Sequence, residues 1–165
     1  MGLSESAYFS SWLFHYFIYF TVISLLDTLI LTQILDDSSF FLVWLWIWLF
    51  CMTFFGKAVL LSSLFTSAKL GIVFGICIWF MEAVMHDVCY ANRRNMDVNT
   101  QFWVAINPFI ATSFSGDIFL ALDAGGIGLN FSNLGFEYNN FKVGYQLFWC
   151  SIIAIVTTTL GIYLE

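Results

Sequence analysis

The sequence predicts an all-α protein: a polytopic bundle of about four membrane-spanning helices, with a re-entrant helical hairpin before the last span. Hydrophobic residues make up 61% of the chain and charged residues only 10%, whereas soluble domains are about half apolar and a quarter charged. The mean hydropathy is +0.87. The apolar residues form separate runs of roughly 20 residues, the length that a helix needs to cross a hydrocarbon core. A multi-pass integral membrane protein is therefore expected, and no signal selects a particular membrane.

The first half of the chain contains two predicted spans. The first covers residues 12–34, carries Asp27 in its second half and ends before a short acidic segment. The second covers residues 40–61 and opens with several Trp and Phe residues, whose rings suit the headgroup level of a bilayer. Lys57 lies near the far end of this second span.

A third span is predicted over residues 67–86, with Glu82 near its exit. The following stretch, residues 87–100, is polar and is expected to lie in water or at the membrane interface. The last span, residues 143–164, has no charged residue and is the clearest in the sequence.

Residues 102–122 are apolar but are interrupted by Asn107-Pro108 and carry Asp117. Proline removes a backbone donor and disfavours helix in the residue before it, so two short helices fit better than one straight span. We interpret the segment as a re-entrant or interfacial hairpin, each half of which matches about half a bilayer. A fifth full span is the alternative.

Composition and motifs exclude several functions. The net charge of -6 argues against a basic surface for nucleic acid. The four cysteines are scattered, without the paired spacing of a zinc site or a disulfide framework. The glycine-rich residues 125–128 form a turn rather than a phosphate loop, because no Lys-Ser or Lys-Thr follows at the required spacing. We therefore expect no metal, no cofactor and no enzymatic activity in this chain.

Three charged residues within or near the spans are candidates for function, because a charge inside a bilayer costs about 2.5–3.5 kcal/mol on insertion scales. Asp27 is either a substrate-path or proton-linked group, or a side chain that reaches the nearby interface. Lys57 either has such a role or extends its charge along the helix to water. Glu82 is expected to meet Arg93 or Arg94 in the following loop.

Two further motifs carry predictions of a different kind. Gly71 and Gly75 form a small-xxx-small pattern, which favours close helix packing. Asn130-Phe131-Ser132 is an N-glycosylation sequon, which has meaning only if the loop faces the lumen or the exterior.

Three groups of residues share features that composition does not explain. The first is Met1-Gly2-Leu3-Ser4 followed by Ser11-Trp12. The second is the connection from Ser62 to Leu70, running into Gly71 and Gly75. The third group comprises Asn107-Pro108, Phe114, Asp117, the segment from Gly126 to Leu134, and Tyr163-Leu164-Glu165. In this order and spacing, the residues resemble the membrane domain of the A subfamily of ABC transporters, which is of the ABC-2, lipid-exporter-like type.

The resemblance covers essentially the whole chain, with two departures. Asn107 stands where the family usually has Ser, and Phe131 where it usually has Trp. The resemblance implies that residues 1–165 are a partial ABC-2 type transmembrane domain, equivalent to the last four spans. It also places both termini in the cytosol and the loop with Asn130 outside, although the basic residues run against the positive-inside tendency.

The function implied by the resemblance is a contribution to translocation of lipid or another amphipathic substrate, powered by a separate ATPase domain. The expected partners are membrane lipids, the remaining spans and that ATPase domain, so the chain is interpreted as a fragment, a split-gene product or a diverged remnant. The alternative function is that of a small accessory or structural subunit of a membrane complex, with no transport role. An intramembrane enzyme is disfavoured, because the sequence has no convergent His, Asp and Ser cluster.

Overall fold

Four long helices form the frame of the molecule. The computed structural model describes residues 5–165, with side chains from Ser10 onward, so Met1–Ser4 of the resemblance lie outside the described residues. The long helices are α1 (Glu5–Leu31), α2 (Phe40–Leu64), α3 (Ala68–Asn92) and α6 (Val143–Leu164). Each is long and apolar enough to cross a membrane. The chain is thus a multi-pass integral membrane protein.

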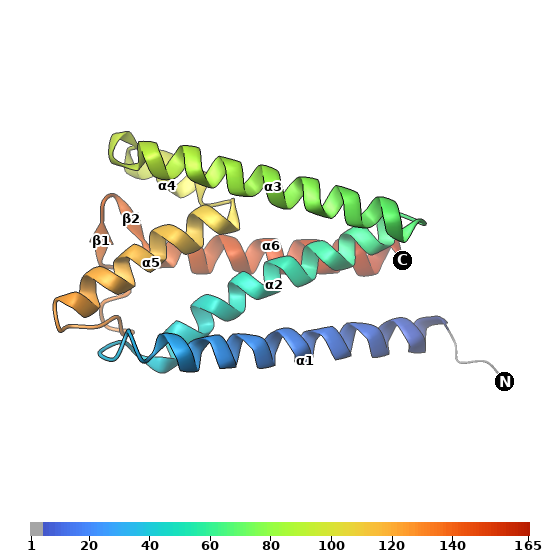
Figure 1. Cartoon of the computed structure of the whole chain (residues 1–165), viewed down its shortest axis with the longest axis horizontal. Coiled ribbons are helices and arrows are strands. Elements are labelled where there is room, and N and C mark those ends of the chain that lie inside the picture. The colour runs from blue at the N-terminus through green and yellow to red at the C-terminus, as the bar shows by residue number, and fades with distance from the viewer. Residues whose placement is uncertain (1–4) are drawn as a thin grey trace.

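The shorter elements gather at one end of the bundle. They are the 3₁₀ turn η1 (Arg93–Asn95), α4 (Val98–Val104), α5 (Pro108–Ala124), and the two-residue strands β1 (Glu137–Tyr138) and β2 (Phe141–Lys142). Figure 1 shows that α1 begins and α6 ends at the opposite end. The all-α class is confirmed for the described residues, with one small antiparallel strand pair added.

Helix bounds agree best with prediction where hydropathy changes sharply. The last helix covers the predicted residues 143–164, and α2 begins at the predicted residue 40 but continues to Leu64. The largest differences are in α1, which begins at Glu5 instead of residue 12, and in α3, which ends at Asn92 instead of residue 86. Residues 87–92 are polar enough to leave the hydrocarbon but contain no helix-breaking residue. The end of the apolar run therefore does not mark the end of the helix.

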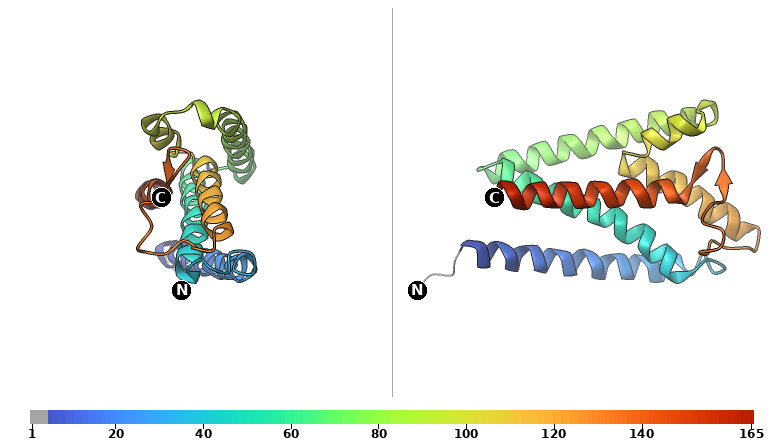
Figure 2. Two further views of the ribbon diagram at one scale, coloured as in Figure 1. Left: turned by 90° about the vertical axis from the view of Figure 1, so that its left-hand side faces the viewer. Right: turned by 180° about the vertical axis from the view of Figure 1, so that it is seen from behind.

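Helix α2 is the centre of the bundle. Figure 2 shows α2 between α5 and α6, with α1 on one side and α3 on the other. The main core contains residues from α2, α5, α6 and the loops between them. The ring of Trp46 of α2 packs against the tilted ring of Phe119 of α5, with ring centroids 4.9 Å apart. The buried Gln146 of α6 donates a hydrogen bond to the Trp46 carbonyl at 3.0 Å.

Two glycines allow α2 and α6 to cross closely. A Cβ added at Gly161 would lie 2.8 Å from the backbone nitrogen of Leu60, and one added at Gly56 would lie 3.0 Å from the Ala154 carbonyl oxygen. By contrast, a Cβ at Gly71 or Gly75 would make only ordinary contact, at 3.8 and 3.4 Å. Within the described chain, the close crossing of these helices is therefore at Gly56 and Gly161, and Gly71 and Gly75 make no comparably close contact.

The glycine-rich turn after α5 packs onto the loop between α1 and α2. Gly128 has a φ of +60°, and a Cβ there would overlap the Asp37 carbonyl and lie 2.8 Å from the Ser38 nitrogen. The amide of Leu129 donates to Ser38 Oγ at 2.9 Å, and the amide of Ser39 donates to the Leu129 carbonyl at 2.8 Å. Glycine at position 128 is therefore required both by backbone conformation and by close approach.

Candidate functional site

The first polar site is an ion pair between two spans. Lys57 of α2 pairs with Glu82 of α3, and the two side chains are only 19% and 18% exposed. The expectation that Glu82 meets Arg93 or Arg94 is wrong. The reason is that α3 continues as a straight helix past Glu82 and carries both arginines away from it, to the end of the bundle.

The bend between α4 and α5 is anchored next to this pair. Asn107 caps α5, because its side-chain oxygen accepts a hydrogen bond from the Phe109 amide at 3.0 Å. Its side-chain amide also donates to the Glu82 backbone carbonyl at 2.9 Å. A serine at this position can cap the helix, but it is shorter and has no amide group for Glu82. The departure from the family pattern at residue 107 thus coincides with a contact that serine does not offer.

Aromatic rings surround the bend and the ion pair. Phe109 makes edge contacts with Phe50 and Phe54 of α2, both at 5.6 Å, and with Trp79 of α3 at 6.0 Å. An apolar pocket of about 320 Å³ lies beside the ion pair, and Phe20, Phe54, Trp79, Lys57 and Glu82 are among its lining residues. The Oε2 atom of Glu82 is buried and accepts no hydrogen bond from the described residues. Charge and aromatic surface therefore meet between α1, α2 and α3.

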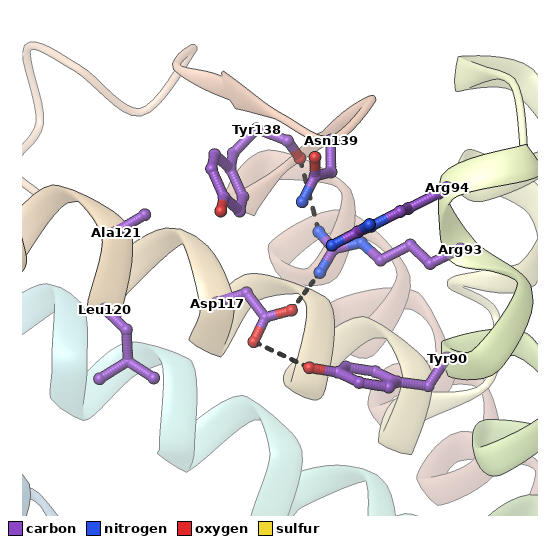
Figure 3. Close-up of a pocket in the computed structure, with 8 residues that line it drawn as sticks. All are labelled: Tyr90, Arg93, Arg94, Asp117, Leu120, Ala121, Tyr138 and Asn139. Carbon is purple, nitrogen blue, oxygen red and sulfur yellow. Dashed lines mark hydrogen bonds and ion pairs between the residues drawn. The ribbon is translucent and has the colours of Figure 1, made fainter.

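The second polar site lies at the end of α3. Arg93 is 5% exposed, pairs with Asp117 of α5, and lies over the Phe114 ring with its Cζ 4.1 Å from the centroid. Tyr90 donates a hydrogen bond to the other oxygen of Asp117 at 3.4 Å. Figure 3 shows these contacts converging on Asp117. The ion pair ties the end of α3 to the middle of α5.

A tight hairpin closes this second site from above. Asn139 and Asn140 have positive φ angles of 49° and 64°, the conformation of a two-residue hairpin turn. This turn places the Tyr138 carbonyl 3.4 Å from Arg93 Nη2, which donates to it. The buried Gln101 of α4 donates to the Asn139 carbonyl at 2.7 Å. The site is thus assembled from α3, α4, α5 and the β1–β2 turn.

An open pocket of about 450 Å³ lies over this cluster. Its lining residues, all labelled in Figure 3, are Tyr90, Arg93, Arg94, Asp117, Leu120, Ala121, Tyr138 and Asn139. Arg94 extends into the pocket, and no carboxylate among residues 10–165 pairs with it. The pocket lining therefore carries two positive charges and one negative charge.

The other candidate residues lie apart from both sites. Asp27 is exposed on α1 among exposed apolar side chains, and no ion pair to it is present in the described part of the chain. Asn130 lies in the loop after α5, where its side-chain oxygen accepts hydrogen bonds from the amide and hydroxyl of Ser132, at 3.0 and 2.6 Å. Glycosylation of Asn130 and a function for Asp27 remain predictions.

One group of carboxylates has the spacing of a metal site. Oxygen atoms of Asp36, Asp37 and Asp123 lie within 4.8 Å of one another. However, Asp123 Oδ1 already accepts hydrogen bonds from the Asp37 amide and the Ser38 hydroxyl. This group joins the α1–α2 loop to the end of α5, and its hydrogen bonds account for the position of Asp123.

Sequence reasoning missed the Arg93–Asp117 pair and the Gln101 contacts. These partners are 24 and 38 residues apart in sequence. In the sequence, Asp117 argued against a fifth span and belonged to the residues of the family resemblance, but no partner was predicted for it. The available signal was Asp117 alone, a charged residue within an apolar segment, because such charges are usually paired.

The fold and these contacts define a multi-pass membrane protein whose helices are joined by intramembrane and interfacial ion pairs. Over 136 residues, the chain is 26% identical to the mouse (Mus musculus) retinal-specific phospholipid-transporting ATPase ABCA4. The match covers 81% of this chain and 6% of that protein. The chain is thus a distant homologue of part of an ABC transporter of the A subfamily, and the resemblance noted from its motifs is confirmed. No family model matches the sequence.

Proposed function

We propose that residues 1–165 act as a partial ABC-2 type transmembrane domain of an ABC-A-like transporter, contributing to translocation of lipid or another amphipathic substrate. The observation that carries the proposal is the similarity to a phospholipid-transporting ATPase along 81% of the chain. ATP hydrolysis would come from a separate domain, since the regular elements of residues 5–165 are helices apart from one short strand pair, and these residues contain no nucleotide-binding fold.

The helices at the two sides of the bundle support association with further membrane segments. No side chain of α3 is buried, and most of the described side chains of α1 are exposed. Asp27 lies on this exposed surface of α1, where contact with lipid alone would be costly for a carboxylate. We infer that the remaining spans of the transporter cover Asp27 and supply a polar partner for it.

We also propose that α4 and α5 form a hairpin that enters the membrane and leaves it on the same side. Asn107 at the bend contacts Glu82, which lies within the candidate membrane span of α3. The two arms are unequal, however. With 7 and 17 residues, α4 and α5 extend about 10 and 25 Å, so α5 is longer than the expected half of a bilayer.

Photo-crosslinking from position 27 tests the assignment as a transporter component. A benzophenone amino acid replaces Asp27 in the tagged full chain, expressed in its native membrane, and a second variant carries it at the exposed loop residue Ile127 as a control. We expect position 27, but not position 127, to crosslink to a second membrane polypeptide. The complex isolated through the tag should hydrolyse ATP, and a change in the phosphate-loop lysine of the captured polypeptide should abolish the activity.

Two results would overturn this proposal. Crosslinks to lipid alone would mean that Asp27 has no protein partner. Crosslinks to a polypeptide without ATP-dependent activity would favour the accessory-subunit function instead.

A further inference from the structure

We propose that the pocket at the end of α3 binds the phosphate of a phospholipid headgroup, with Arg94 as the main contact. The pocket has a volume of about 450 Å³ and is lined by two arginines, two tyrosines and an asparagine. Binding requires only that the end of α3 lies at the membrane surface. The proposed lipid site therefore does not depend on the proposed transport function.

The charges in the pocket favour an anion. Asp117 is engaged by Arg93 and Tyr90, so its charge is already matched. Arg94 is left without a carboxylate partner among the residues with described side chains, and the lining carries a net charge of +1 from Arg93, Arg94 and Asp117. This surplus stands out in a chain with a net charge of -6. A phosphodiester carries one negative charge, and its two free oxygens match the planar fork of a guanidinium group.

The neighbouring side chains provide further donors. Figure 3 shows the rings of Tyr90 and Tyr138 on different sides of the two arginines, with the Asn139 side chain next to them. Tyr138 is exposed, so its hydroxyl is accessible to a ligand. Arg94 and Asn139 are exposed as well, whereas the Tyr90 hydroxyl already donates to Asp117. The accessible donors of the cluster are thus the N–H groups of Arg94 and Asn139 and the hydroxyl of Tyr138.

The position of the pocket favours a lipid over a soluble phosphate. Arg93 and Arg94 directly follow the long apolar helix α3, which places them where a span meets water. Leu120, which is 54% exposed, and Ala121 form an apolar border of the same pocket. A headgroup phosphate in the pocket would leave its acyl chains beside these apolar side chains and α3.

Native mass spectrometry of the purified full chain in detergent tests this site. The chain is titrated with phosphatidylglycerol, with phosphatidylcholine, and with diacylglycerol, which has the same acyl chains but no phosphate. We expect saturable adducts with both phospholipids and much weaker ones with diacylglycerol. Arg94→Gln should weaken phospholipid binding about tenfold, the loss that corresponds to one charge-assisted hydrogen bond.

Matched variants keep the result interpretable. Lys69→Gln removes a cation from the start of α3, at the other end of the bundle, and should leave binding unchanged. Arg94→Lys keeps the charge but loses the planar fork, and should give an intermediate affinity. Arg94 is exposed, so its substitution should preserve the fold, which circular dichroism and the Tm of each variant verify.

Three outcomes would overturn the proposal. Equal binding of diacylglycerol would mean that the phosphate is not recognised. An unchanged affinity of Arg94→Gln would place the lipid elsewhere. Binding of soluble glycerol 3-phosphate as tightly as the phospholipids would show a site for free phosphate rather than for a lipid.

Discussion

At the scale of single residues, the polar side chains inside the bundle are held by more than one contact. The Glu82 side chain pairs with Lys57 while its backbone carbonyl accepts a hydrogen bond from Asn107. Arg93 combines an ion pair with Asp117, a ring contact with Phe114 and a hydrogen bond to the Tyr138 carbonyl. Each polar residue therefore joins separate helices, and changing one of them affects several contacts.

Removing one partner of the Lys57–Glu82 pair should destabilise the chain more than removing both. The side chains are 19% and 18% exposed, so Lys57→Met or Glu82→Leu leaves a largely buried charge unpaired, at a cost of about 3 kcal/mol. The double variant should recover most of that loss. A double-mutant cycle on the free energy of unfolding, measured by SDS titration in mixed micelles, gives the coupling. Additive losses in the double variant would show that the two groups do not interact.

The N-terminal cap of α4 should lose its stabilising effect in acid. Asp97 caps this helix, and the hydrogen bonds from Thr100 hold the pKa of the Asp97 carboxyl below its ordinary value of 3.8. Because the folded state favours the carboxylate, the cap stabilises α4 above that ordinary value, and its contribution is lost as the pH falls through the lowered pKa.

NMR of the chain labelled with ¹⁵N-threonine follows this titration from about pH 6 to about pH 2. We expect the Thr100 amide signal to move with a midpoint below 3.8. In Asp97→Asn the neutral amide still caps the helix, so the movement should disappear. A midpoint at or above 3.8 would mean that the cap does not form in solution.

At the scale of elements, the α2–α6 contact is the main structural joint of the bundle. Its closest approach depends on a glycine from each helix, Gly56 and Gly161, whereas α3 is joined to the rest by polar contacts at Glu82 and Arg93 and by aromatic contacts with α5. Close packing of small residues is a principal source of helix association in lipid, because lipid removes the usual hydrophobic driving force. The α2–α6 pair is therefore expected to be the most stable unit.

Gly161→Ala should weaken this joint. The added methyl group would lie 2.8 Å from backbone atoms of Val59 and Leu60, which have little freedom to move, so α2 and α6 must separate. Overpacking of this kind costs about 1–3 kcal/mol. Gly144→Ala in the same helix is the control, because no atom lies within 4 Å of its added Cβ. Thermal unfolding in detergent should show a lower Tm for the first variant and no loss for the second. An equal Tm for both would contradict the close crossing.

At the scale of the whole molecule, the sequence predicted the number and placement of the long helices, because bilayer thickness fixes helix length. The start of α2 and both ends of α6 agree with the hydropathy changes. The partners of Glu82 and Arg93 were not predictable in this way. They depend on the rotation of each helix and on the continuation of α3 to Asn92, neither of which leaves a local signal. Similarly, Gly56 and Gly161 lie on different helices and form no motif along the chain.

The last prediction concerns the path of the chain across the membrane. If α4 and α5 form a re-entrant hairpin, Asp97 and Ser132 lie on the same side, and Thr66, in the turn between α2 and α3, lies on the other. A full span at residues 102–122 would instead place Asp97 and Ser132 on opposite sides and reverse the direction of α6. Both residues are exposed, as is Thr66, so single cysteines there are accessible to reagents.

Labelling of sealed vesicles with a membrane-impermeant maleimide decides between these paths, in a chain whose native cysteines are replaced. We expect cysteines at positions 97 and 132 to react from one side and a cysteine at position 66 from the other.

Labelling at position 106, beside the bend, distinguishes a re-entrant hairpin from an interfacial one. The Ile106 side chain is 52% exposed on the surface of the bundle. Its neighbour Asn107 contacts Glu82 within the α3 span, so a re-entrant hairpin would place Ile106 in lipid. A cysteine at position 106 should therefore resist the reagent from both sides until detergent is added. Reaction of position 106 in intact vesicles would place the bend at the surface, and reaction of positions 97 and 132 from opposite sides would establish a fifth span.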